Sequence, residues 1–370
     1  MPSPAAAGEG EGEGTLTYLE EGLPRVSAEN LATTVAAMFQ KLGLPPEDAA
    51  LAADGLVAAD LRGVTSHGVS QILRNYLDRL RDGGTNPRPN WQLTREMPAG
   101  GNVDCDRGMG LVVVPKVMEL AIRKAREVGV CMISMHNARH LGMAQYHARL
   151  ALKHDMLGLC MTSTSPHMAP TFGRIARLGT NPIAFAAPCA EEPPFVYDAA
   201  TTVSAGNKLN VYKLMGLPVP AGYVVDDQGR PVMEPSEHGA NHVLLPLGSS
   251  PDTASHKGYA LAAMVDVLCS VLGGLTFGAR LAARDYNHFV AAINIDAFVP
   301  VAEFKQAMDD FVRMLKATPP AAGCERVLYP GQLEWEAEQD RRATGIPLHP
   351  DVLAWFDQTC VELGLVKLER

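Results

Sequence analysis

The chain has 370 residues, of which 47% are hydrophobic and 20% charged, and its formal net charge is −9. This is the composition of a globular protein long enough for two domains and a core without disulfides. The acidic balance and the lack of Lys/Arg runs exclude a nucleic-acid partner, whereas a small anionic substrate fits a local basic pocket. The seven cysteines are scattered singly, without metal-ligand spacing, which predicts buried thiols in a reducing compartment and no metal site.

Residues 1–14 are small, acidic and repetitive, so they predict a disordered tail rather than a secretory signal. The most apolar later stretch, 259–277, is interrupted by Asp266 and a glycine pair. It therefore predicts a buried helix rather than a membrane span, and we expect a cytoplasmic protein.

Helical periodicity begins at Ser27, a good N-cap, and stops at Gly43. Two prolines followed by acids open a second helix over 45–60, because proline suits the first turn and acids suit its positive end. A third amphipathic stretch covers 72–80. Residues 15–95 are thus predicted to form a helical domain.

Beyond residue 96, helical segments alternate with short β-type runs without strict βαβ repetition. The expected helices are 115–128, 143–154 and 256–272, and the expected strands are 130–135, 157–162, 183–187, 195–197, 223–225 and 289–295. Residues 301–370 turn helical again, at 304–315 and 350–363, and are expected to rejoin the helical domain. The pattern predicts an α+β fold with a mixed α/β domain over 96–300.

The dinucleotide fingerprint G-x-G-x-x-G follows none of the expected strands, and the P-loop, H-E-x-x-H and G-x-S-x-G motifs are also missing. A nucleotide, if bound, must therefore be held by another architecture.

Two histidines lie where chemistry is commonly placed. Ser66 and His67 stand between Gly63 and Gly68 at a helix end, so they could face a cleft, although a capped helix end with a surface histidine explains the pattern equally well. His140 directly follows an apolar strand and precedes a helix, a position suited to a general acid or base. A plain loop histidine is the alternative.

Two further segments could bind a nucleotide. Residues 179–185 and 196–202 could present amides and hydroxyls to a phosphate or ribose, although turn chemistry accounts for most of both. Lys257 at the start of the long apolar helix could attract an anionic group, although a solvated lysine is commoner there.

Taken in order, the segments DLRGVTSHG, KAREVGV, LGTNPIAFAAP, YDAATT, LPLG, KGYALAAMVDVL and GIPL resemble the malate/L-lactate/ureidoglycolate dehydrogenase family, from about residue 24 to the C-terminus. The resemblance implies a helical domain joined to a non-Rossmann, mixed-sheet nicotinamide-binding domain. It also implies NAD or NADP as cofactor and a homodimer with its active site near the subunit interface.

The resemblance further implies a role for individual residues. His140 is matched to the proton donor and acceptor, and Ser66 and His67 to the active-site pair. The residues expected to bind the cofactor are Thr164, Thr180, Asn181, Asp198, Ala199, Ala200, Lys257, Asn287, His288 and Phe289.

One departure concerns the substrate carboxylate. Family members often carry Arg four residues after the SHG histidine, where this chain has Gln71. Arg74, or less directly Arg62 or Arg139, is therefore expected to supply the charge. The main hypothesis is hydride transfer between NAD(P) and a small 2-hydroxy acid. The alternatives are reduction of a cyclic imino acid and a non-catalytic relative, the latter favoured by Gln71 and a seemingly shortened segment 274–286.

Overall fold

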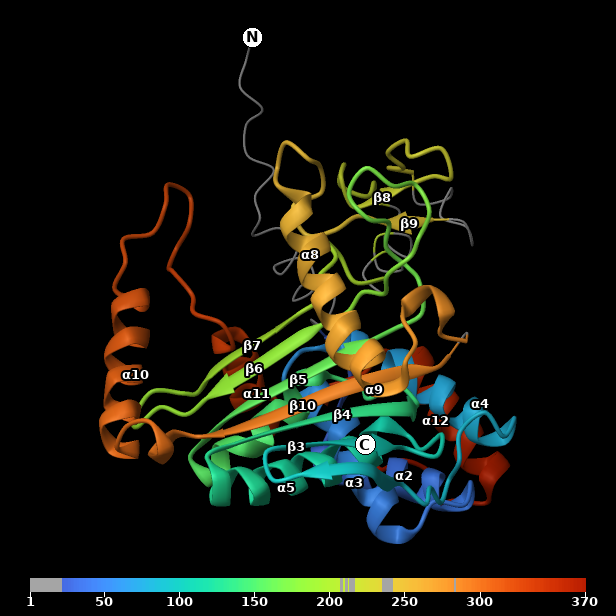
Figure 1. Cartoon of the computed structure of the whole chain (residues 1–370). Helices are drawn as coiled ribbons and strands as arrows, with labels where there is room; N and C mark the ends of the chain where they lie inside the picture. The colour runs from blue at the N-terminus through green and yellow to red at the C-terminus, as the bar shows by residue number, and fades with distance from the viewer. Residues whose placement is uncertain (1–21, 207–208, 210–211, 213–216, 235–241, 283) are drawn as a thin grey trace.

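The computed structural model describes residues 22–206, 209, 212, 217–234, 242–282 and 284–370; the expected tail at 1–14 lies outside them. A seven-stranded sheet crosses the molecule with helices on both faces (Figure 1). Its order is β2 (Gln92–Met97), β3 (Gly100–Asp104), β4 (Val130–Ala138), β10 (Tyr286–Asn294), β5 (Met156–Ser163), β6 (Ile183–Ala187) and β7 (Phe195–Ala199). In this sheet β3 and β4 pair in parallel and all other neighbours are antiparallel. The predicted α+β, non-Rossmann fold is confirmed.

The strands alternate as a sheet buried on both faces requires. In β4, Ile133 and Met135 join the core beneath α5 (Gly110–Val128), whereas the Ser134 hydroxyl, on the other face, donates to the Leu268 carbonyl at 2.9 Å. The sequence missed β2 and β3. β2 is a mostly exposed edge strand and β3 opens with two glycines, so neither shows an apolar alternation.

The first helices form a layer under the sheet: α2 (Ala28–Lys41), α3 (Pro46–Leu61), α4 (Arg74–Arg81) and, from the C-terminus, α12 (Pro350–Leu363). The Ser27 hydroxyl accepts a hydrogen bond from the Asn30 amide at 3.1 Å, which confirms the predicted N-cap. Phe39 of α2 and Phe356 of α12 are fully buried in one shared apolar cluster. The short strands β1 (Arg25–Val26) and β11 (Ile346–Pro347) pair and join the two ends of this layer.

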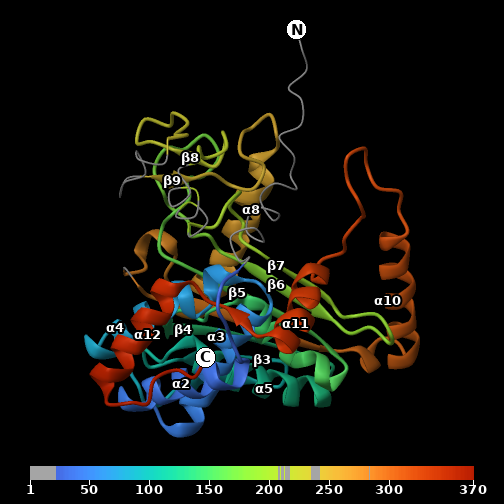
Figure 2. The ribbon, with the colours of Figure 1, turned by 180° about the vertical axis from the view of Figure 1, so that it is seen from behind.

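The remaining C-terminal helices lie elsewhere. In both views α10 (Val301–Lys316) stands at the end of the sheet opposite α4 and α12 (Figures 1 and 2), where Val312 packs with Cys189 and Tyr329. α11 (Gln332–Thr344) returns beside α3. The C-terminal segment thus returns to the first helices through α11 and α12, whereas α10 packs away from them. The division into domains stays a prediction.

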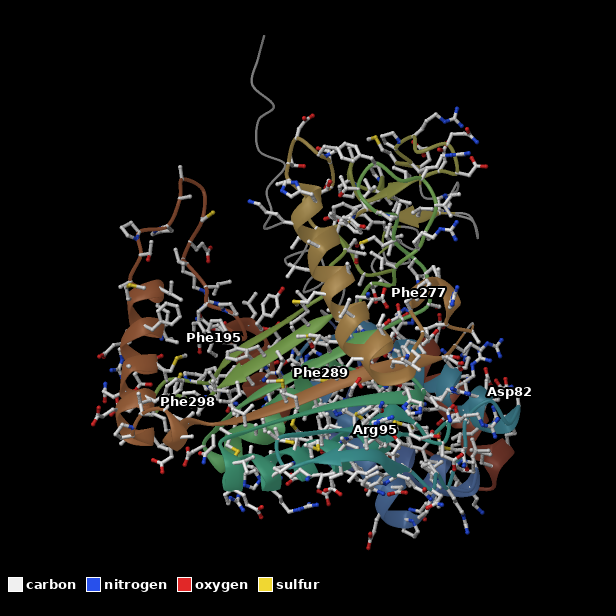
Figure 3. All side chains as sticks on the ribbon, in the orientation of Figure 1. Asp82, Arg95, Phe195, Phe277, Phe289 and Phe298 are labelled. Carbon is white, nitrogen blue, oxygen red and sulfur yellow. The ribbon has the colours of Figure 1, made fainter. Side chains whose placement is uncertain are left out.

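A long helix packs its C-terminal part on the other face of the sheet, whereas its first turns rise away from the sheet (Figure 1). α8 (Ser255–Asp266) continues through a π-helical turn, Val267–Val271, into α9 (Leu272–Gly274), and Cys269 packs on Phe289 of β10 (Figure 3). The small hairpin of β8 (Val224–Val225) and β9 (Val243–Leu244) lies beyond it. Among the described residues, Ser255–Gly274 is long and apolar enough to cross a membrane by length and composition, a test that core helices also pass, with 39% of it buried. The predicted buried helix therefore buries one side only.

Two helices flank His140 in the chain. α5 begins at Gly110, five residues before its predicted start. The predicted helix 143–154 forms as α6 (Ala144–Ala148) followed by a 3-10 turn, Arg149–His154.

Candidate active site

A hollow of about 510 Å³ opens where the first turns of the α4 region meet the ends of β4 to β7 and the start of β10. Elements from across the whole chain contribute to its wall. The residues named from the sequence that line it are Ser66, His67, Gln71, Arg139, His140, Thr164, Thr180, Asp198, Ala199 and Ala200. The structure thus brings most of the expected site together.

His140 follows the end of β4, and neighbouring groups fix its ring. Its Nδ1 lies 2.6 Å from the Tyr76 hydroxyl and accepts from the Gly142 amide at 3.1 Å. The ring stacks on His67, with centroids 5.8 Å apart and planes 12° apart, and meets Tyr286 edge-on at 5.2 Å. With Nδ1 engaged by the protein, Nε2 is the nitrogen that can serve a substrate.

The surroundings of both stacked histidines disfavour a positive charge. Burial, with smaller contributions from the nearby His67, His288 and His147, lowers the pKa of His140 to about 3. Burial likewise lowers the pKa of His67 to about 4. Both rings are therefore neutral in the free protein at pH 7.

Ser66 and His67 occupy a 3-10 turn, Thr65–His67, directly after α3. The Ser66 hydroxyl lies 2.9 Å from His67 Nδ1, so the serine orients that ring. The glycines on either side act differently: Gly63 adopts a positive φ of 75°, whereas Gly68 is extended and is needed because a Cβ there would collide with the Asp60 carboxylate. The sequence predicted an unusual backbone angle at Gly68; the structure shows instead that glycine is needed there because the Asp60 side chain packs against it.

The expected carboxylate anchors are placed differently from the prediction. Gln71 lines the hollow, but Arg74 turns away and its guanidinium lies 5.1 Å from the Trp355 ring centroid, so its proposed role is corrected. The π-helical turn Val69–Leu73 explains this. A π-helical turn holds more residues than an α-helical one, so Arg74, three residues after Gln71, does not reach the helix face on which Gln71 lies. Arg139 lines the hollow, with its guanidinium donating to Asp285 at 2.8 Å and to the Gly84 carbonyl at 2.6 Å.

Several residues expected to bind the cofactor serve the scaffold instead. Asn181 is fully buried, where its side chain accepts from the Thr164 amide and donates to the Ala262 carbonyl. Lys257 lies exposed on the first turn of α8, outside the lining of the hollow.

The stretch in β10 is corrected in the same way. His288 bonds Thr162 and the Arg139 carbonyl inside the sheet, Phe289 packs under the long helix, and Asn287 donates to Ser270. Tyr286, just before them, is the residue of this strand that lines the hollow.

Several residues of the wall were not expected from the sequence, among them Tyr76, Arg79, Arg284 and Tyr286. Helical spacing held a signal for one of them, because Gln71, Asn75 and Arg79 recur at i, i+4 and i+8 and all line the hollow. The two tyrosines stand 64 and 146 residues from His140, and no local pattern connects them to it.

A nicotinamide dinucleotide fits a second stretch of the wall. The small residues Ala199, Ala200 and Gly206 line it together with Thr164 and Thr180. The Thr180 amide donates to the Thr164 hydroxyl at 3.2 Å, which fixes the two strand ends relative to each other. Small side chains and ordered hydroxyls suit a flat ring and its ribose.

Asp198 adds a titratable group to this stretch. Its pKa is raised to about 7, mainly by burial; the Gln145 amide, donating at 2.8 Å, opposes the rise and the nearby Glu334 adds to it. Its charge therefore changes within the working pH range.

A neutral, immobilised imidazole inside an open hollow, with arginines in the same wall, defines an enzyme that moves a proton on a small anionic substrate. Residues 26–356 match the family described as malate/L-lactate dehydrogenase. The chain belongs to this family of NAD(P)-dependent 2-hydroxy-acid oxidoreductases, as the sequence motifs predicted.

Relatives of the chain match over nearly its whole length. A malate dehydrogenase from Pyrococcus abyssi is 37% identical over 95% of this chain and 98% of its own length. An L-sulfolactate dehydrogenase from Methanocaldococcus jannaschii is 36% identical over 91% of this chain and 96% of its own length. The solved malate dehydrogenase of Pyrococcus horikoshii superposes with a TM-score of 0.86 at 34% identity, covering 94% and 98% of the two chains.

Proposed function

We propose that this enzyme interconverts a small 2-hydroxy acid and its 2-oxo acid, with His140 carrying the proton of the hydroxyl group. The observation that carries the proposal is the fixed, uncharged imidazole in the hollow, with Nδ1 held by the protein. When bound, the nicotinamide takes up or gives the hydride at C2 of the substrate. The protein's part is to hold the acid, exclude water and move the proton.

Tyr76 lets His140 exchange this proton. To accept the hydroxyl proton at Nε2, neutral His140 must carry its own proton on Nδ1. That proton donates to the Tyr76 oxygen 2.6 Å away, and the bond that the Gly142 amide donates to Nδ1 is given up in this tautomer. The Tyr76 hydroxyl in turn donates to the His140 carbonyl at 3.3 Å. In the opposite tautomer the same hydroxyl donates to Nδ1, so one rotating hydroxyl supports both states.

The substrate carboxylate is proposed to lie along Ser66, His67 and Gln71. The amide of Gln71 supplies a neutral donor where a charge was expected, and Ser66 holds His67 in place beside His140. Thr164, Thr180 and the segment 198–200 are proposed to bind the cofactor, with NAD and NADP tested side by side.

Replacing His140 tests the proposal directly. His140→Ala should lower turnover of the preferred acid at least about a thousandfold while NADH fluorescence still reports binding, because the proton carrier alone is lost. His154→Ala, a partly buried histidine outside the lining of the hollow, is the matched control. The panel contains oxaloacetate, pyruvate, a ureidoglycolate-type acid and a cyclic imino acid, each with NADH and NADPH.

Two outcomes would contradict the proposal. Near-normal activity of His140→Ala would remove His140 from the reaction. Turnover of the cyclic imine alone would favour the imine reductase, and failure of the wild-type chain to bind either cofactor would leave only a non-catalytic relative.

We further propose a cytoplasmic homodimer. All seven cysteines are free and six are buried, which suits a reducing compartment. The outer side of the long helix exposes an apolar stripe through Met264, Val267, Val271 and Leu272 that a second copy would cover.

A further inference from the structure

Two arginine side chains converge at one edge of the hollow. Arg79, near the end of α4, lies 3.0 Å from the Asp82 carboxylate, and Arg284, just before β10, lies 3.5 Å from the same oxygen. Asp82 stands at the outer edge of the molecule beside α4 (Figure 3), with its side chain 45% exposed. Arg79 is 3 residues and Arg284 is 202 residues from Asp82 in the chain, and both guanidinium groups approach the same carboxylate oxygen.

This pair belongs to the hollow of His140. Both arginines line the hollow, whereas Asp82 is outside its lining. The charge of Arg79 acts on Tyr286, whose pKa it lowers against the larger effect of burial, and the Tyr286 ring meets the His140 ring at 5.2 Å. Arg284 has a positive φ of 84°, a backbone conformation that costs free energy and is common at ligand sites.

The wall also holds two carboxylates, Asp198 and Glu334, which act on each other, and among the described residues neither forms an ion pair with Arg79 or Arg284. Gln71 and Asn75 face the hollow from the same helical stretch as Arg79 and are neutral. Arg139 is tied to Asp285 by a bond of 2.8 Å. The carboxylate of a monoanionic substrate can bind the neutral donors near His67. The arginine pair is a second, positively charged site for another anionic group.

We propose that Arg79 and Arg284 bind a second anionic group of the substrate, a carboxylate or a sulfonate, so that this enzyme prefers dianionic 2-hydroxy acids. In the free enzyme Asp82, from outside the hollow, holds both guanidinium groups and competes with that anion for them. The inference rests on the proposed function, because it presumes that a 2-hydroxy acid reacts at His140. The pair is placed on the substrate rather than on a cofactor phosphate because it lies beside the ring that contacts His140.

Malate and lactate separate the two ends of the substrate, since they share the 2-hydroxy-acid head and differ in the second carboxylate. Wild-type kcat/KM should favour malate at least about a hundredfold, and Arg284→Gln should cut that ratio about tenfold, mainly through the KM of malate. Asp82→Asn should lower the KM of malate about threefold, because it removes the competing charge while its amide oxygen still accepts from the Gly84 amide. Arg280→Gln is the control, because it removes an arginine that lies outside the lining of this hollow. It should leave the malate-to-lactate ratio of kcat/KM unchanged.

Each remaining outcome decides against the inference in a distinct way. Equal losses for malate and lactate in Arg284→Gln would assign the pair to the shared carboxylate, and a loss with NADP⁺ but not with NAD⁺ would assign it to the cofactor phosphate. Comparable wild-type activity on both acids would overturn the dianion preference and leave the proposed function standing. Failure to oxidise any 2-hydroxy acid would overturn both.

Discussion

The lowered pKa of His140 predicts an unusual pH profile. In the free enzyme burial, together with the nearby His67, His288 and His147, holds this pKa at about 3. Oxidation of the hydroxy acid needs neutral His140, whereas reduction of the oxo acid needs its protonated form. Because kcat/KM reports the pKa values of the free enzyme, its pH dependence for oxidation and for reduction should reflect the low pKa of His140.

A histidine pKa of about 3 and an ordinary one of about 6.5 predict the most different oxidation rates between pH 5 and 6.5. An ordinary histidine of pKa about 6.5 is about 90% protonated at pH 5.5, so oxidation would run about tenfold below its plateau. With a pKa of about 3, His140 is protonated to less than about 1% at that pH, so kcat/KM for oxidation should be flat from pH 5 to 8. Reduction should fall about tenfold for each pH unit over the same range, because the protonated fraction falls in that proportion.

The assay follows NAD(P)H absorbance in both directions with lactate and pyruvate, which are anionic throughout this range. Asp198 is the group that complicates it, because its pKa of about 7 falls inside the window. The profile is therefore repeated with Asp198→Asn, whose amide oxygen still accepts from Gln145. An oxidation rate at pH 5.5 that lies about tenfold below the plateau at pH 8 in both proteins would refute the reasoning.

Two further predictions follow from single contacts. Tyr76→Phe should reduce kcat for oxidation about tenfold, with little change in KM, because the Nδ1–H of His140 loses its acceptor; an unchanged kcat and pH profile would show that the hydroxyl is dispensable. Glu338→Ala should lower the free energy of unfolding by about 3 kcal/mol in a urea titration, because the Arg62 guanidinium, 2% exposed, loses its carboxylate partner at 2.9 Å and keeps the uncharged Gln145. Glu336→Ala on the same helix, whose ion pair is half exposed, should cost less than about 1 kcal/mol, and equal losses would count against the buried pair.

The sequence alone determined the local structure and the chemical class. The polar cap at Ser27, the proline pair before α3 and the apolar run of β4 act within one turn or one strand, so each could be recognised without the fold. The same holds for the position of His140 after a strand. The missing glycine fingerprint correctly excluded a Rossmann fold.

The tertiary structure decided which side chains meet. Periodicity gives the faces of an element but not the elements that those faces contact, so Tyr76 and Tyr286 could not be assigned to His140 beforehand. A single π-helical turn, which no residue pattern marks, places Arg74 on Trp355, so that Arg79 rather than Arg74 lines the hollow. The reaction type follows from short motifs, whereas the charges that select the substrate come from segments that only the folded chain brings together.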